Sequence, residues 1–80
     1  MSKTQEIMQV IENAHYMGEN GLRDYHVAQA VKSALCKPNF VERFYAVKSA
    51  LHAYRVSVTI GDNQSIRIYR HDTSQELIFS

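Results

Sequence analysis

Residues 46–70, AVKSALHAYRVSVTIGDNQSIRIYR, decide the fold, because the spacing of the apolar side chains changes inside this stretch. Up to Tyr54 the apolar residues recur every three or four positions, as on one face of a helix. From Arg55 onwards apolar and polar residues alternate, as in a strand with one buried face. Two alternating runs flank the loop Gly61–Gln64, which predicts a β-hairpin over about 56–70. Its outer face is expected to carry Ser57, Thr59, Arg67 and Tyr69.

Three helices are expected before the hairpin, over about 3–17, 22–36 and 39–54. The third begins after Pro38, where Asn39 and Glu42 have the spacing of a capping box. Gly18 stands where the first helix needs a residue of positive φ at its end. The apolar stripe of the second helix is expected to consist of Tyr25, Ala28, Val31, Ala34 and Leu35. That of the third is expected to consist of Phe40, Phe44, Val47, Leu51 and Tyr54.

The C-terminal residues 71–80 form a polar tail with the apolar tip Leu77, Ile78 and Phe79. Such a tip either folds back on the core or docks on a partner subunit, and we expect these three residues to form a protein interface. A chain of 80 residues has room for one small core. We therefore expect a single domain over 1–80 of the α+β class, with three helices followed by a C-terminal β-hairpin.

The composition excludes several classes of protein. No apolar run approaches the ~18 residues that a membrane span needs. Glu6 and Glu12 interrupt the apolar core that a signal peptide would require. The single cysteine, Cys36, cannot form an internal disulfide, which is usual for proteins of a reducing compartment. We expect a cytoplasmic protein with no membrane partner.

Catalytic and metal-binding motifs are missing from the sequence. Cys36 has no neighbouring base that would activate it as a nucleophile. The four histidines lie far apart, and no pair of cysteines or histidines has the spacing of metal ligands. No glycine-rich loop follows a strand to bind a phosphate. We expect no enzymatic activity, no cofactor, no metal and no small-molecule substrate.

Positive charge is concentrated in the middle of the chain. Residues 25–71 contain seven Lys and Arg against two acidic residues, although the net charge of the whole chain is only +1. A local excess of this kind favours a polyanionic partner. Arg55, Arg67 and Arg70 fall at the start, on the outer face and at the end of the hairpin, and Tyr69 lies beside the last two. This part of the hairpin is expected to follow a DNA backbone.

Residues 46–70 also resemble the second half of Cro-type phage repressors, in which a recognition helix runs directly into a strand, a short polar loop and a second strand. The resemblance implies a Cro-like or winged-helix fold in which Tyr45, Lys48 and Ser49 face the major groove. It further implies that Arg55 contacts phosphate and that the C-terminal tail pairs the subunits of a homodimer. The helix-turn-helix signature itself is not met, because Lys37 and Val41 stand where the motif has a small residue and usually glycine.

Two non-catalytic functions fit these observations. The first is a regulatory protein of phage or mobile-element type that controls transcription by binding duplex DNA. Its expected DNA-binding residues are Tyr45, Lys48, Ser49, Arg55, Arg67, Tyr69 and Arg70. The second is a protein–protein interaction module, such as an inhibitor, adaptor or anti-defence factor, that acts through exposed aromatic residues and the apolar tail. The basic middle of the chain places DNA first.

Overall fold

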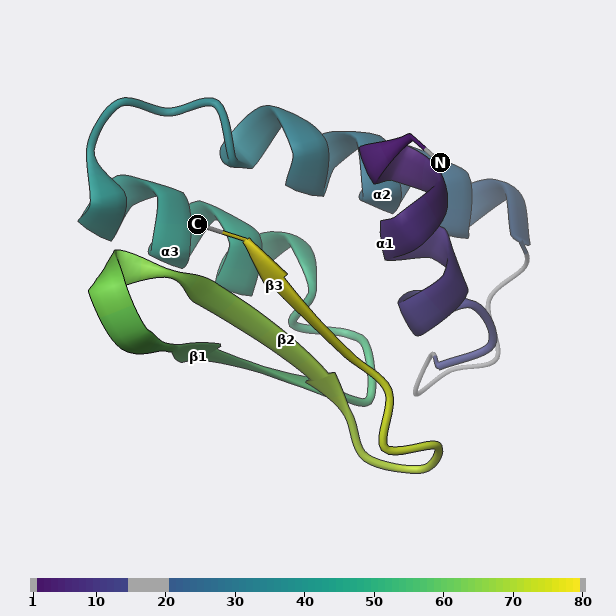
Figure 1. The fold of residues 1–80 in the computed structure, drawn as a ribbon. Coiled ribbons are helices and arrows are strands. Elements are labelled where there is room, and N and C mark those ends of the chain that lie inside the picture. Colours follow the sequence, from purple (N-terminus) through teal and green to yellow (C-terminus); the bar gives the residue numbers. More distant parts are fainter. Residues whose placement is uncertain (1, 15–20, 80) are drawn as a thin grey trace.

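The computed structural model describes residues 2–14 and 21–79, and only the backbone of residues 21–23. Three α-helices are followed by three β-strands, with a short 3₁₀ turn between the first two strands (Figure 1). The elements are α1 (Lys3–Ile11), α2 (Gly21–Ala34), α3 (Phe40–Ala50), β1 (Val56–Ile60), η1 (Asp62–Gln64), β2 (Ile66–Arg70) and β3 (Glu76–Phe79). The predicted α+β class and the predicted hairpin are confirmed.

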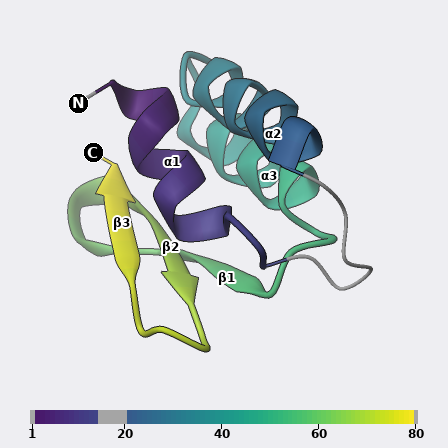
Figure 2. The same ribbon diagram turned by 90° about the vertical axis from the view of Figure 1, so that its right-hand side faces the viewer.

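The strands form one antiparallel sheet in the order β1-β2-β3, so β1 and β3 are its edges. Val58 pairs with Ile68, and Ile68 pairs with Leu77, on the face that packs against the core. Figure 2 shows the helices on this one side of the sheet. The register places Ser57, Thr59, Arg67 and Tyr69 together on the opposite face, as predicted, and β3 adds Glu76 and Ile78 to it.

The sheet has one strand more than the predicted hairpin, because the tail folds back as β3 along β2. Leu77 and Phe79 are half-buried and pack against the core, whereas Ile78 is 58% exposed on the outer face. The sequence of β3 is only four residues long and reads Glu-Leu-Ile-Phe, without alternation of apolar and polar residues. The periodicity rule therefore had no signal for this strand.

The first helix ends at Ile11, so the expectation of a helix to residue 17 is wrong. Residues 11–14 form a type II turn, in which Glu12 has φ −57° and ψ 125° and Asn13 has φ 62°. The N–H of Ala14 donates to the carbonyl of Ile11 at 3.0 Å. Asparagine tolerates positive φ better than most residues, and Ala14 keeps the apolar spacing although it lies beyond the helix. Gly18 lies outside the described residues.

The third helix begins as predicted and ends early. The side chain of Asn39 accepts hydrogen bonds from the N–H groups of Val41 and Glu42, which fixes the first turn. The helix stops at Ala50 rather than near 54, and tight turns follow, one closed by the Tyr54 N–H on the Leu51 carbonyl at 3.0 Å. This change of direction brings Tyr54 into the core.

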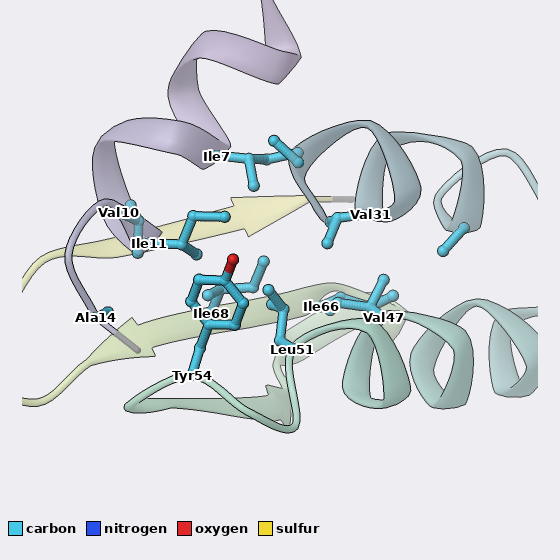
Figure 3. Close-up of a cluster of buried hydrophobic side chains, with 12 residues drawn as sticks. Ile7, Val10, Ile11, Ala14, Val31, Val47, Leu51, Tyr54, Ile66 and Ile68 are labelled. Carbon is cyan, nitrogen blue, oxygen red and sulfur yellow. The ribbon is translucent and has the colours of Figure 1, made fainter. Parts of the chain in front are cut away.

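The core lies between the helices and the inner face of the sheet, and Figure 3 shows the Tyr54 ring among Ile11, Leu51 and Ile68. The predicted stripe of α3 supplies Val47, Leu51 and Tyr54 to the core, with Phe40 and Phe44 half-buried at its margin. The fully buried side chains of the core come from every helix, from the turns after α3 and from β2: Ile7, Ile11, Ala28, Val31, Val47, Tyr54, Ile66 and Ile68, among others.

The buried face of α2 is as predicted at Ala28, Val31 and Ala34, but not at Tyr25. Tyr25 is 43% exposed, and its hydroxyl accepts a hydrogen bond from the Gln29 side chain. Asp24 takes the inner position instead at 1% exposure, and its carboxylate accepts a hydrogen bond from the Tyr54 hydroxyl at 3.1 Å. A rule that assigns only apolar residues to the buried face cannot predict Asp24, because the hydrogen bond that makes its burial favourable comes from a distant residue.

Candidate binding groove between α3 and β1

The predicted DNA-binding residues fall in four different environments. Tyr45, Lys48 and Ser49 lie on the exposed side of α3, with Tyr45 at 60% exposure. Arg67 and Tyr69 lie on the outer face of the sheet. Arg55 is exposed immediately before β1, and its backbone N–H donates to the Ala14 carbonyl at 2.6 Å. Arg70 is buried.

Arg70 fastens the sheet to the end of α1 and does not face solvent. Its residue exposure is 8%, and its guanidinium donates to the carbonyls of Val10 (3.1 Å) and Glu12 (2.6 Å) and to both carboxylate oxygens of Asp72. The hydrogen bond with Asp72 raises the pKa of Arg70, and the same bond lowers the pKa of Asp72. Arg70 shares the inner face with Ile66 and Ile68 because side chains of a strand alternate. The alternation in the sequence already contained this signal.

The outer face of the sheet has little free positive charge. The Arg67 Nε lies 2.6 Å from the Glu76 Oε2, and the Arg67 guanidinium lies 5.2 Å from the centre of the Tyr69 ring. A hollow of about 490 Å³ beside this ion pair is lined by Asp62 as well as Arg67 and Glu76, so acidic groups outnumber the cation there. Tyr69 additionally makes an edge contact with His71.

A second hollow, which we call the α3–β1 groove, lies between the end of the third helix and the first strand. It has a volume of about 330 Å³ and is lined by Lys48, Leu51, His52, Tyr54, Val56, Ser57 and Val58. Leu51 and Tyr54 are buried and form part of the core, so they give the groove a rigid apolar base. Lys48, on the last turn of α3, and His52, in the turn that follows the helix, are both exposed.

The strand side of the groove is an open sheet edge. β1 pairs with β2 on one side, and no other described strand pairs with it on the other side. Successive residues of a strand direct their backbone groups to opposite sides, so β1 presents unpaired N–H and C=O groups at this edge. Its sequence, Val-Ser-Val-Thr-Ile, has no charge and no proline, and four of its five residues are β-branched. None of the side-chain features that usually block an edge is present in β1.

The electrostatic character of the α3–β1 groove is positive. Lys48 lines it, Arg55 precedes β1, and the described lining residues include no acidic side chain. Ser57 links the groove to the outer face, because its Oγ lies 2.7 Å from the Nε2 of His71. The ring Nδ1 of His52 donates to the Ser49 carbonyl at 3.0 Å, which orients the imidazole at the end of α3.

The three residues predicted for a protein interface lie on opposite faces of the sheet. Ile78 is available on the outer face, while Leu77 and Phe79 contribute to the packing between β3 and the core. The Phe79 ring also lies 5.7 Å from the Lys3 ammonium of α1. An interface that uses all three residues would require β3 to leave the sheet.

The open edge was not visible in the sequence, because a hairpin has two free edges until a third strand covers one of them. The structure places β3 on β2, and no other strand in residues 2–14 and 21–79 pairs with β1, which makes His52, Ser57 and Val58 parts of a surface that sequence reasoning missed. Among the described residues no helix is long and apolar enough to cross a bilayer, and no group of three His, Cys, Asp or Glu side chains is placed to bind a metal. Comparison with protein-family models, with curated protein sequences and with solved structures finds no match to this chain.

Proposed function

We propose that this chain is a small, non-catalytic protein-interaction module whose binding site is the α3–β1 groove. The observation that carries the proposal is the edge of β1 beside the exposed side of α3, on which no strand of the described residues pairs. A partner segment in extended conformation adds to β1 as a fourth strand. Its backbone hydrogen-bonds to the free groups of β1 and provides affinity, and alternate side chains enter the groove and provide specificity.

The distribution of charge favours this proposal over DNA binding by the hairpin. Arg70 is committed to the interior and Arg67 is paired with Glu76, so two of the three hairpin arginines are already neutralised. Tight binding to duplex DNA needs several cations that contact phosphates at once. An edge strand needs no such array, because most of its contacts are backbone hydrogen bonds.

Photo-crosslinking in cells tests the proposal with a matched pair of positions. Benzoylphenylalanine replaces Tyr45, on the exposed side of α3, or Tyr25, which is similarly exposed on α2. We expect protein adducts from position 45 that map to one segment of one partner, and none from position 25. Equal adducts from both positions, or none from either, would contradict the proposal.

Duplex DNA is a second candidate partner, favoured by one observation. Tyr45, Lys48 and Ser49, which the resemblance to Cro-type repressors assigns to the major groove, do lie on the same exposed side of α3. This supports regulatory DNA binding through α3 with Arg55 at a phosphate.

Fluorescence anisotropy with a labelled random-sequence duplex tests this candidate. If DNA is the partner, binding weakens by about tenfold or more between about 50 and 200 mM salt, because counterions are released. Lys48→Glu then reduces binding at low salt, whereas Lys32→Glu, the same change on the exposed side of α2, has a smaller effect. Absence of binding at low salt removes DNA from consideration.

A further inference from the structure

The two walls of the α3–β1 groove differ in chemistry, and the difference specifies the occupant. The helix wall has the cationic Lys48 and the imidazole of His52, while the strand wall has only the uncharged Val56, Ser57 and Val58. Building on the proposed function, we propose that the groove binds an extended acidic segment of a partner protein. A carboxylate of this segment lies on the side that faces α3, opposite Lys48.

Lys48 is the charged group that a guest strand meets on the helix wall. It is exposed on the last turn of α3, whereas His52 lies in the turn that follows the helix. α3 packs against β1, and the two run alongside each other in Figure 1, so a guest strand on β1 passes the exposed side of α3. A carboxylate on the side of the guest that faces α3 therefore meets Lys48.

The apolar base determines what else the segment carries. Leu51 lies between Lys48 and His52 in sequence and lines the bottom of the groove with Tyr54. A neighbouring aliphatic residue of the guest on the same side extends over this base and loses its contact with water. The expected guest is thus a strand-forming segment with an acidic residue that faces Lys48 and a valine or isoleucine two positions further on.

A second copy of the chain fits the groove less well than an acidic segment does. The most direct self-association would pair two β1 strands, and β1 contributes Val-Ser-Val-Thr-Ile, which has no carboxylate. Lys48 and His52 would then face uncharged residues, and the two Lys48 ammonium groups would be brought toward each other without a counter-charge.

Titration with labelled synthetic peptides tests the inference. The probe is an acetylated and amidated eight-residue peptide with Asp at i and Val at i+2. Its controls are the same peptide with Asp replaced by Asn, and an isomer with Asp moved by one position, which turns the carboxylate to the opposite side of the strand. We expect the Asp peptide to bind about threefold or more tightly than either control, a ratio that one partly exposed ion pair supplies. Lys48→Glu abolishes the preference and Lys32→Glu retains it, with unchanged circular dichroism for both.

Each other outcome overturns the inference. Equal binding of the Asp and Asn peptides shows that the groove accepts strands without a preference for acid, and leaves the proposed function intact. Failure of all three peptides to bind overturns the acidic guest, and the crosslinking at positions 45 and 25 then decides the proposed function separately. A dimer in sedimentation equilibrium that the peptide does not dissociate identifies a second copy as the occupant. The surface is a nucleic-acid site if two results are found together. Duplex DNA, added at an equal concentration of charge, displaces the Asp peptide, and the Asn peptide binds as tightly as the Asp peptide.

Discussion

The position of the Arg70 side chain is determined by its hydrogen-bond partners rather than by the usual preference of arginine for solvent. An arginine at the end of a strand is usually solvated, yet here it bonds to two carbonyls of the α1 end and to Asp72. We expect Arg70→Ala to lower the free energy of unfolding by about 2–3 kcal/mol, because buried acceptors lose their donor. Arg67→Ala, on the outer face of the same strand, removes an exposed ion pair and should cost about 1 kcal/mol or less. Urea unfolding followed by circular dichroism measures both, and equal losses would contradict the assigned role of Arg70.

Asp72 connects the same contact to acid stability. Its pKa lies below the ordinary value of 3.8, chiefly because of the hydrogen bond from Arg70. A carboxyl whose pKa is lowered by folding stabilises the folded state above its unfolded pKa, and this contribution is lost as the pH falls through the folded pKa. We expect the melting temperature of the wild type to fall more steeply below about pH 4 than that of Asp72→Asn. Parallel curves for the two proteins would show that the ion pair has no thermodynamic effect.

At the scale of elements, the formation of β3 makes the C-terminal tail part of the sheet. Leu77 points toward the core and Ile78 away from it, although the two are neighbours of similar size. We expect Leu77→Ala to destabilise the protein by about 1–2 kcal/mol, less than a fully buried leucine because the site is half exposed. Ile78→Ala should change stability by about 0.5 kcal/mol or less. Thermal melts of the two variants distinguish a strand of the sheet from a free tail, in which both changes would be neutral.

The elements that the sequence predicted correctly are those specified by local rules. The Asn39 cap starts α3, and the alternation on both sides of the Gly61 loop gives the hairpin and its two faces. The errors arose where contacts between residues far apart in the sequence determine the position of a side chain. Asp24 is inside because Tyr54 reaches it, and Arg70 is satisfied by carbonyls near residue 11. The candidate groove could not be predicted for the same reason, since it exists only because β3 pairs with β2 rather than with β1.

For the whole molecule, the core joins all three helices to the central strand, and we expect it to unfold as one unit. Ile11 contacts this shared core and is fully buried. Ile11→Ala should lower stability by about 2–4 kcal/mol. The far-ultraviolet signal of the helices and the near-ultraviolet signal of the tyrosines should be lost at the same urea concentration in both proteins. Separate transitions would show that the sheet and the helices unfold independently.

The contact between Arg70 and the carbonyl of Val10 also has a consequence for the order of events during synthesis. The two residues are 60 positions apart in the chain. At about 5–20 residues per second, a ribosome needs several seconds to reach Arg70 after it has made α1. Throughout that interval Ile7 and Ile11 have no sheet to cover them, so the nascent helix exposes the apolar face that chaperones recognise. The contact between the end of α1 and Arg70 therefore forms only after β2 has been synthesised.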